Sequence, residues 1–215
     1  MEYSNFHLAN IIVHVICGCL ALLIGYILLI KSKGTLFHKK FGRYFVYLMV
    51  IVVITGIFGV IIFKRNMFLL VITILVGYNT YSGVRNIRIK TNQFYFQDLL
   101  AMVLAIAIVS YFWYYLQAIG FYWNPVIIYS TVGYLLMVIS YDIFRYFIPK
   151  NRYGNLWVYE HSCKMISALG GLTDAFIGTI LPDYKPYSQI LPSVITTFIM
   201  IYFVIDIYRK NKIYR

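Results

Sequence analysis

Long runs of apolar residues divide this chain into segments that match the width of a lipid bilayer. Six stretches contain no Asp, Glu, Lys or Arg, and they cover residues 8–30, 44–63, 67–84, 99–123, 125–141 and 187–205. A helix needs about 20 mostly apolar residues to cross a bilayer, and these runs are continuous rather than alternating like the strands of a barrel. The pattern therefore predicts an all-α polytopic membrane bundle.

A seventh segment, residues 155–181, has the length of a crossing helix but carries the ionisable residues Glu160, His161, Lys164 and Asp174. Basic connections flank the neighbouring runs, and their alternation fits only if this segment also crosses. The sequence thus predicts about seven transmembrane helices and treats residues 1–215 as one integral membrane domain.

The distribution of basic residues predicts the orientation of the bundle. Lys and Arg concentrate in cytoplasmic connections near helix ends. Three of the nineteen lie in the opposite connections, and Lys164 lies inside the seventh segment. The other fifteen lie in alternate connections and the tail: Lys31, Lys33, Lys39, Lys40, Arg43, Arg85, Arg88, Lys90, Arg145, Lys150, Arg152, Arg209, Lys210, Lys212 and Arg215. We therefore predict an N-terminus outside and a C-terminus in the cytoplasm.

Composition agrees with the membrane assignment and excludes several classes of protein. The chain is 61% hydrophobic and 12% charged, whereas soluble domains carry about 25% charged residues. The net charge of +12 suits anionic lipid headgroups, and nucleic-acid binding is not indicated because no basic extramembrane domain is present. Phosphate-binding glycine loops, nucleophile elbows and paired-cysteine zinc motifs do not occur, so a soluble type of enzyme is not indicated.

One face of the seventh segment gathers its polar and small residues. At about 100° per residue, a single stripe contains Glu160, Lys164, Ser167, Gly171, Asp174 and Gly178. Charged groups in hydrocarbon are costly unless paired or hydrated, so the stripe should face other helices. Glu160 and Lys164 are spaced for an i,i+4 ion pair, which leaves Asp174 to find another partner, stay protonated or line water.

Two interpretations of that stripe remain open. It provides a transport path through Glu160, Lys164, Ser167 and Asp174, or it is a satisfied ion pair whose small residues only permit close packing.

The histidines form a second set of candidates. His14 continues a line of small residues in the first helix, in its outer half. His38 and His161 are expected at matching depth near the cytoplasmic face, where they could hold a haem, or a divalent metal together with Glu160. His14 and Lys164 complete the set of candidate cofactor-binding residues. The alternative is that each histidine is only hydrogen-bonded to a neighbour.

Short motifs give the chain a family resemblance. They are His14 in the first helix, the run 38–43 (His-Lys-Lys-Phe-Gly-Arg), and the run 157–165, which begins at Trp157 and contains Glu160, His161 and Lys164. With them the chain resembles a family of uncharacterised bacterial multi-pass membrane proteins that have a first-helix His, a His-Arg-x-x-Gly-like segment and a Trp-x-x-Glu-His-x-x-Arg-Met-like segment. The chain has Lys39 and Lys164 where that family usually has arginine. The resemblance implies a bacterial inner-membrane protein and supplies no reaction.

Three function classes follow from the sequence. The first is a redox-type membrane protein with a metal or haem at His38, His161 and Glu160. The second is a transporter, channel or proton-coupled carrier that uses the polar stripe. The third is a scaffold or assembly factor without a ligand.

Overall fold

The computed structural model describes residues 5–64, 66–119 and 124–213, and the regular secondary structure in these ranges is helical. The elements are α1 Asn5–Ile30, α2 Leu36–Ile61, α3 Phe68–Ile89, α4 Phe96–Ile119, α5 Pro125–Phe144, η1 Arg145–Phe147, α6 Lys150–Tyr153, α7 Leu156–Ile180, η2 Pro182–Tyr184 and α8 Tyr187–Ile213. The predicted all-α class is confirmed. Arg65 and residues 120–123, the end of the fourth predicted run, lie outside the described ranges.

Six of the described helices, α1 to α5 and α8, are long and apolar enough to cross a membrane. The remaining long helix, α7, has 25 residues, or a length of about 37 Å, which exceeds a hydrocarbon core of about 30 Å. The charged residues of α7 lower its mean hydropathy, and for this reason α7 is not among the helices that are apolar enough to cross by composition alone.

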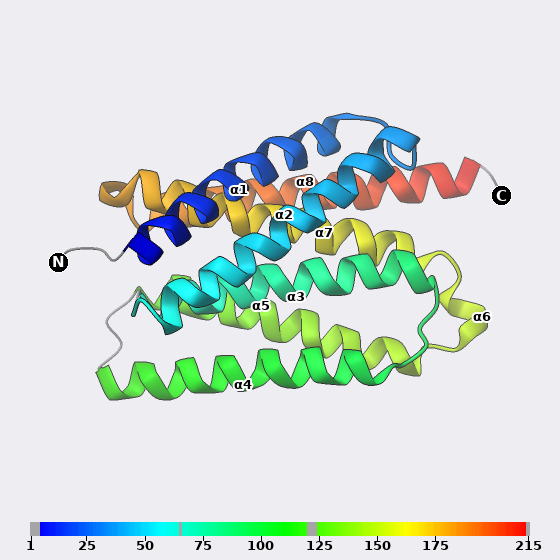
Figure 1. Ribbon diagram of the computed structural model, residues 1–215. Coiled ribbons are helices and arrows are strands. Elements are labelled where there is room, and N and C mark those ends of the chain that lie inside the picture. The colour runs from blue at the N-terminus through cyan, green and yellow to red at the C-terminus, as the bar shows by residue number, and fades with distance from the viewer. Residues whose placement is uncertain (1–4, 65, 120–123, 214–215) are drawn as a thin grey trace.

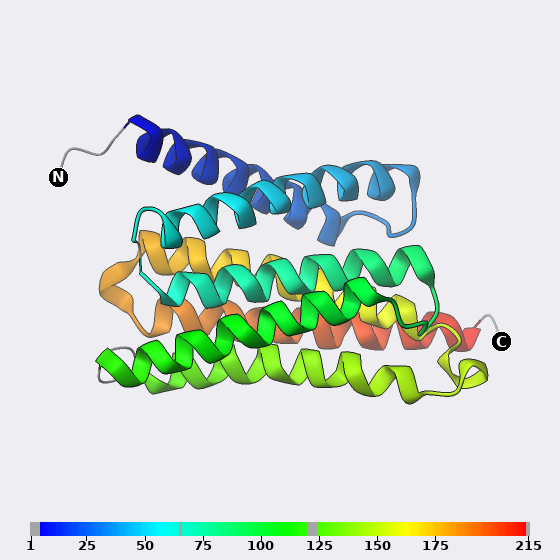
Figure 2. The same ribbon diagram turned by 60° about the horizontal axis from the view of Figure 1, so that its bottom comes forward.

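The long helices run side by side along a common direction (Figures 1 and 2). The start of α1 and the end of α8 lie at opposite ends of the bundle (Figure 1). We name these ends after the short helices found there. The α6 end also holds the ends of α3 and α5 and the start of α7, and the η2 end holds the starts of α3, α5 and α8.

Helix α7 lies inside the bundle, packed mainly against α3 and α8, while α1 packs mainly against α2. Glycines permit the close approach of α7 to its neighbours. A Cβ atom at Gly170 would lie 2.5 Å from Thr196 Cγ2, and one at Gly171 would lie 2.8 Å from Val76 Cγ2. Helix α7 is therefore tightly packed between α3 and α8.

Helix α3 is the other central helix, and α8 is peripheral. Two-thirds of the most apolar window of α3 is buried inside the protein (67%), against 6% for α8. The outer face of α8 exposes large apolar side chains such as Phe198, Ile201 and Tyr202. Such a surface is stable in lipid and would be costly in water.

Side chains next to the helix ends fix several boundaries. The Thr35 hydroxyl accepts from the His38 amide at the start of α2, and the Asn124 side chain caps α5 just before Pro125. Lys33 donates to the carbonyls of Leu28 and Leu29 at 2.8 and 2.7 Å, which satisfies the end of α1. Burial, aided by the charge of Lys210, lowers the pKa of Lys33.

Several predicted boundaries differ from those of the structure. Helix α2 begins at Leu36, so that Lys39, Lys40 and Arg43 lie in a helix and not in a connection, and α8 continues to Ile213. Helix α3 continues to Ile89, so that Arg85 and Arg88 belong to a helix and not to a connection. Helix α5 continues to Phe144 and is followed directly by η1, which brings Asp142 and Arg145 into the protein interior. A charge ends an apolar run in the sequence, but it does not end a helix whose charges are paired.

Candidate functional site

A network of buried charges joins α3, α5 and α7 near the α6 end. The Lys164 ammonium donates to the Asp142 carboxylate and, at 2.6 Å, to the Ser82 hydroxyl. Tyr78 and Ser82 each donate to the other oxygen of Asp142 at 2.9 Å. Both oxygens of this carboxylate are therefore bonded, and Lys164, only 4% exposed, has a counter-charge.

Glu160 forms the second half of the network. Its carboxylate accepts from Arg145 at 2.8 Å, from Tyr141 at 2.8 Å and from Tyr153 at 2.7 Å. Burial and the hydrogen bond to Glu160 raise the pKa of Tyr153, which lies in α6. Arg145 also donates to Asn86 on α3. We call this set the charged network, in which every residue except the exposed Tyr141 is buried: Tyr78, Ser82, Asn86, Tyr141, Asp142, Arg145, Tyr153, Glu160 and Lys164.

The predicted ion pair between Glu160 and Lys164 is wrong. Lys164 pairs with Asp142, and Glu160 pairs with Arg145. The two residues share a face of α7, but each points to a partner on another element. With these partners, the carboxylates of Asp142 and Glu160 each accept three hydrogen bonds. This matters because a buried charge without hydrogen-bond partners is costly.

Another buried ion pair stabilises the connection between α3 and α4. Arg85 pairs with Asp98, which also accepts from the Tyr95 amide at 3.0 Å, and Arg85 donates to the Gln93 carbonyl at 2.6 Å. The space between this pair and the charged network is about 10 Å³. That is room for about one water molecule, so the charged network is too densely packed to hold an organic ligand there.

The polar face of α7 continues past the charged network toward the η2 end. One turn beyond Lys164, the Ser167 hydroxyl lies 2.5 Å from the Tyr134 hydroxyl of α5. Two turns further, Asp174 accepts from Ser193 of α8 at 2.5 Å. The prediction that this stripe faces other helices is confirmed, since Glu160, Lys164 and Ser167 are buried and Asp174 is half-buried.

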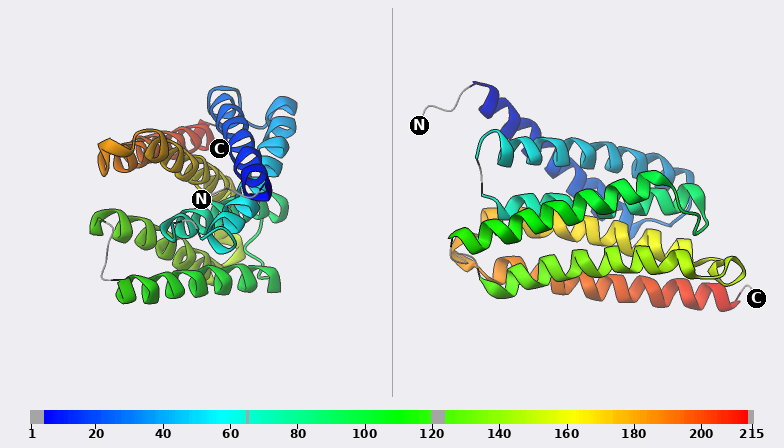
Figure 3. Two further views of the ribbon diagram at one scale, coloured as in Figure 1. Left: turned by 60° about the vertical axis from the view of Figure 1, so that its left-hand side comes forward. Right: turned by 90° about the horizontal axis from the view of Figure 1, so that it is seen from below.

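A cavity of about 330 Å³ lies along this part of α7, and we call it the polar cleft. Helix α5 forms one wall, α7 and α8 form the other, and α3 lies between them. Figure 3 (left) shows α4 and α5 set apart from α7 and α8 on this side. Its polar lining residues are Ser130, Thr131, Tyr134, Ser167, Asp174, Gln189, Ser193, Thr196 and Thr197.

Asp174 is the one charged side chain among the described residues that line the polar cleft. Ser193 bonds one carboxyl oxygen, whereas Oδ1 is buried and has no hydrogen-bond partner in the described part of the protein. The prediction that Asp174 does not use Lys164 is confirmed. A buried carboxyl oxygen without a partner is costly, so this position favours a proton, water or a bound cation.

The histidines near the α6 end are neighbours on different helices. His161 donates from Nδ1 to the Gly83 carbonyl at 2.8 Å, which leaves its Nε2 as an acceptor. His38 is half-buried, its Nδ1 has no partner among the described residues, and the two imidazoles are close enough to interact electrostatically. In the part of the chain that the structure describes, no group of three or more His, Cys, Asp or Glu side chains could hold a metal ion. The set His38, His161 and Glu160 is therefore not gathered as a metal site.

His14 lies elsewhere, against α2. The single proton of the Thr55 hydroxyl is directed to the Ile51 carbonyl at 2.7 Å, so His14 must donate its Nδ1 proton to Thr55 across 2.8 Å. The Nε2 atom is then the acceptor of this ring. His14 lines a separate cavity of about 290 Å³ with Asn10 and Gly59, so it takes no part in the charged network.

Sequence reasoning missed four central members of the charged network: Ser82, Asn86, Asp142 and Arg145. One signal was available, since Asn79, Ser82 and Asn86 recur at helical spacing in an apolar segment. The i,i+3 spacing of Asp142 and Arg145 is a second signal, but the apolar pattern by itself places Arg145 in a connection.

The geometry therefore consists of a dense charged network at one end and a polar cleft that leads toward the other. This geometry does not test membership of the family that the short motifs suggest, so that resemblance stays a prediction. Comparison of the chain with protein-family models, curated proteins and solved structures gives no match.

Proposed function

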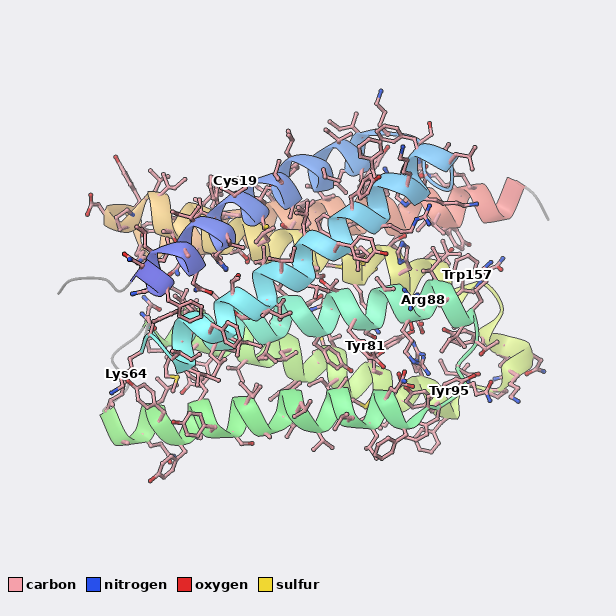
Figure 4. All side chains as sticks on the ribbon, in the orientation of Figure 1. Cys19, Lys64, Tyr81, Arg88, Tyr95 and Trp157 are labelled. Atoms are coloured by element: carbon pink, nitrogen blue, oxygen red, sulfur yellow. The ribbon has the colours of Figure 1, made fainter. Side chains whose placement is uncertain are left out.

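We propose that the protein crosses the membrane seven times, with α7 as the sixth crossing, the α6 end in the cytoplasm and the N-terminus outside. The start of α1 and the end of α8 lie at opposite ends of the bundle, which supports an odd number of crossings (Figure 1). Lys64 lies at the η2 end, whereas Arg88, Tyr95 and Trp157 lie at the α6 end (Figure 4). Basic and aromatic residues at that end suit a cytoplasmic interface.

We further propose that the protein is a proton-linked carrier of small solutes in the plasma membrane. The observation that supports it is the continuity of polar groups along α7, from the cavity at Asp174, through Ser167 and Tyr134, to Lys164. From Glu160 to Asp174 this line covers about 21 Å of a helix that rises about 1.5 Å per residue. A packing role alone does not require a cleft with polar lining residues between the helices.

The two parts of the line have different roles in this proposal. The polar cleft admits the solute from the outer side. The charged network forms the inner barrier, because buried ion pairs with no room for a solute close the path near the cytoplasm. Passage then requires the charged network to rearrange, as in alternating access.

Asp174 provides the link to protons. A carboxylate at membrane depth is stable when protonated or paired and costly when bare. Tyr134 is the other titratable side chain among the described residues that line the polar cleft, and Lys164 lies beyond it, paired with Asp142. Binding of the solute in the polar cleft is therefore coupled to the protonation of one carboxylate.

The experiment is performed on purified protein in vesicles that contain a pH-sensitive dye. Three membrane-impermeant solutes are added outside in turn: phenyltrimethylammonium, benzenesulfonate and sucrose. We expect at least one of them to change the internal pH in protein-containing vesicles and not in empty ones. Asp174→Asn should reduce this response by at least about tenfold, because the shared carboxylate is lost.

Asp206→Asn is the matched control, since Asp206 carries the same group on a partly exposed part of α8, where it pairs with Lys210. It should respond like the unmodified protein. Absence of a response to all three solutes contradicts the carrier proposal.

Cofactor binding at His38 and His161 is the second candidate. It is favoured by the hydrogen bond from His161 Nδ1 to the Gly83 carbonyl, because ligating histidines characteristically donate from the other ring nitrogen to a carbonyl or carboxylate. The carrier is preferred because the polar cleft has volume and lining groups, whereas no third ligand from His, Cys, Asp or Glu joins this pair within the described residues.

A further inference from the structure

We propose that the polar cleft binds a small organic cation with an apolar body, and that Asp174 is its counter-charge. This inference rests on the carrier proposal for its biological meaning, but the geometry of the cleft supports it independently. Three features of the cleft point to such a ligand: its charge, the chemistry of its walls and the unsatisfied carboxyl oxygen.

The negative charge of the polar cleft favours a positively charged ligand. Asp174 is the one charged group among the described lining residues, and its Oδ1 is buried without a partner there. The nearest cation along α7, Lys164, is already bonded to Asp142 and Ser82. An anion in the polar cleft would face an uncompensated carboxylate, whereas a cation completes its pairing.

The remaining residues that line the polar cleft indicate that the body of the ligand is apolar. Aromatic rings of Phe68 and Tyr134 and aliphatic side chains of Ile72, Leu75 and Val194 line the same cavity. Aromatic faces attract ammonium groups, most strongly where water is excluded. A volume of about 330 Å³ lies at the lower end of the range for small-molecule sites. A substituted ammonium with one aromatic ring fits this combination better than a sugar or a metal ion.

A purely structural role would need Asp174 to be satisfied within the protein. Ser193 satisfies one oxygen, and no donor among the described residues satisfies the other. The hydroxyls of Ser130 and Thr197 donate to carbonyls of their own helices and not to the carboxylate. The unsatisfied oxygen and the adjacent cavity are therefore two features of one site.

The test is calorimetric titration of the purified full-length protein with phenyltrimethylammonium. We expect saturable binding that Asp174→Asn weakens by at least about tenfold, since it removes the charge and keeps an oxygen that accepts from Ser193. Asp206→Asn should bind normally. Tert-butylbenzene, the uncharged isostere, should bind more weakly than the cation to the unmodified protein.

A second variant guards against an effect of Asp174→Asn on folding. Ser130→Phe enlarges a residue of α5 that lines the polar cleft and leaves Asp174 itself unchanged, and it should also block binding. Leu136→Phe enlarges an exposed residue of α5 that does not line the cleft, and it should have no effect.

Three results overturn the inference: no saturable binding, equal affinity of Asp174→Asn, or equal affinity for tert-butylbenzene. The vesicle experiment separates this failure from that of the carrier proposal. A proton response to benzenesulfonate alone keeps the carrier and refutes the cation. Binding of the cation that depends on Asp174, without any vesicle response, keeps the site and refutes the carrier.

Discussion

Replacing Asp142 with asparagine is expected to reduce the free energy of unfolding by about 3–5 kcal/mol, the usual cost of leaving a buried charge without its partner. The new side chain keeps one acceptor oxygen, but its NH2 group would present donor hydrogens either to Lys164 or to Tyr78 and Ser82, which already donate to the two oxygens of Asp142. The loss is measured by reversible unfolding in mixed micelles, followed by circular dichroism.

A double-mutant cycle identifies the cause of that loss. The combined variant Asp142→Asn, Lys164→Met removes both charges, so it should recover more than half of the stability lost by Asp142→Asn. Asp206→Asn breaks an exposed pair with Lys210 and should cost less than about 1 kcal/mol. If Asp142→Asn is as mild as this control, the charged network does not stabilise the bundle.

Replacing Gly171 with leucine is expected to disrupt the contact between α7 and α3. The added Cβ atom alone would lie 2.8 Å from Val76 Cγ2 and 3.2 Å from Leu75 Cδ2. Overpacking of a close-packed interior typically costs about 1–3 kcal/mol, and more where two helix backbones must separate. We expect a lower melting temperature in detergent and a smaller yield of folded protein.

Gly133→Leu is the matched control for position 171. A Cβ atom at Gly133, on α5, would meet nothing within 4 Å, and the residue is exposed. The same change of volume should therefore be tolerated. Equal effects of the two substitutions would mean that α7 is not tightly packed against α3.

The architecture was largely predictable because its physical cause is local. Each apolar run is long enough to be a helix, and the low charge of the chain requires lipid-like surroundings. The inward direction of the α7 stripe was also predictable, since helical spacing places Lys164 and Ser167 on one face. The ends of α3 and α5 were not predictable in the same way, because helices extend past an apolar run where their charges find partners.

The partners in the charged network could not be predicted from spacing. Lys164 is closer in sequence to Glu160 than to Asp142, yet it pairs with Asp142. The choice depends on how α5, η1 and α7 approach one another, and that is decided by packing across the bundle. The position of the polar cleft depends in the same way on the separation of α5 from α8, which no local pattern records.

Crossing of the membrane by α7 is the central claim, because both the polar cleft and the charged network derive their meaning from it. Reporter fusions at Thr91, at Asn151 and after α8 test it directly, with an enzyme that is active on one side of the membrane only. We predict a cytoplasmic signal at all three positions, since two crossings, α7 and α8, separate Asn151 from the C-terminus. A cytoplasmic signal at Asn151 with an external signal at the C-terminus would show that α7 does not cross, and it would contradict this account.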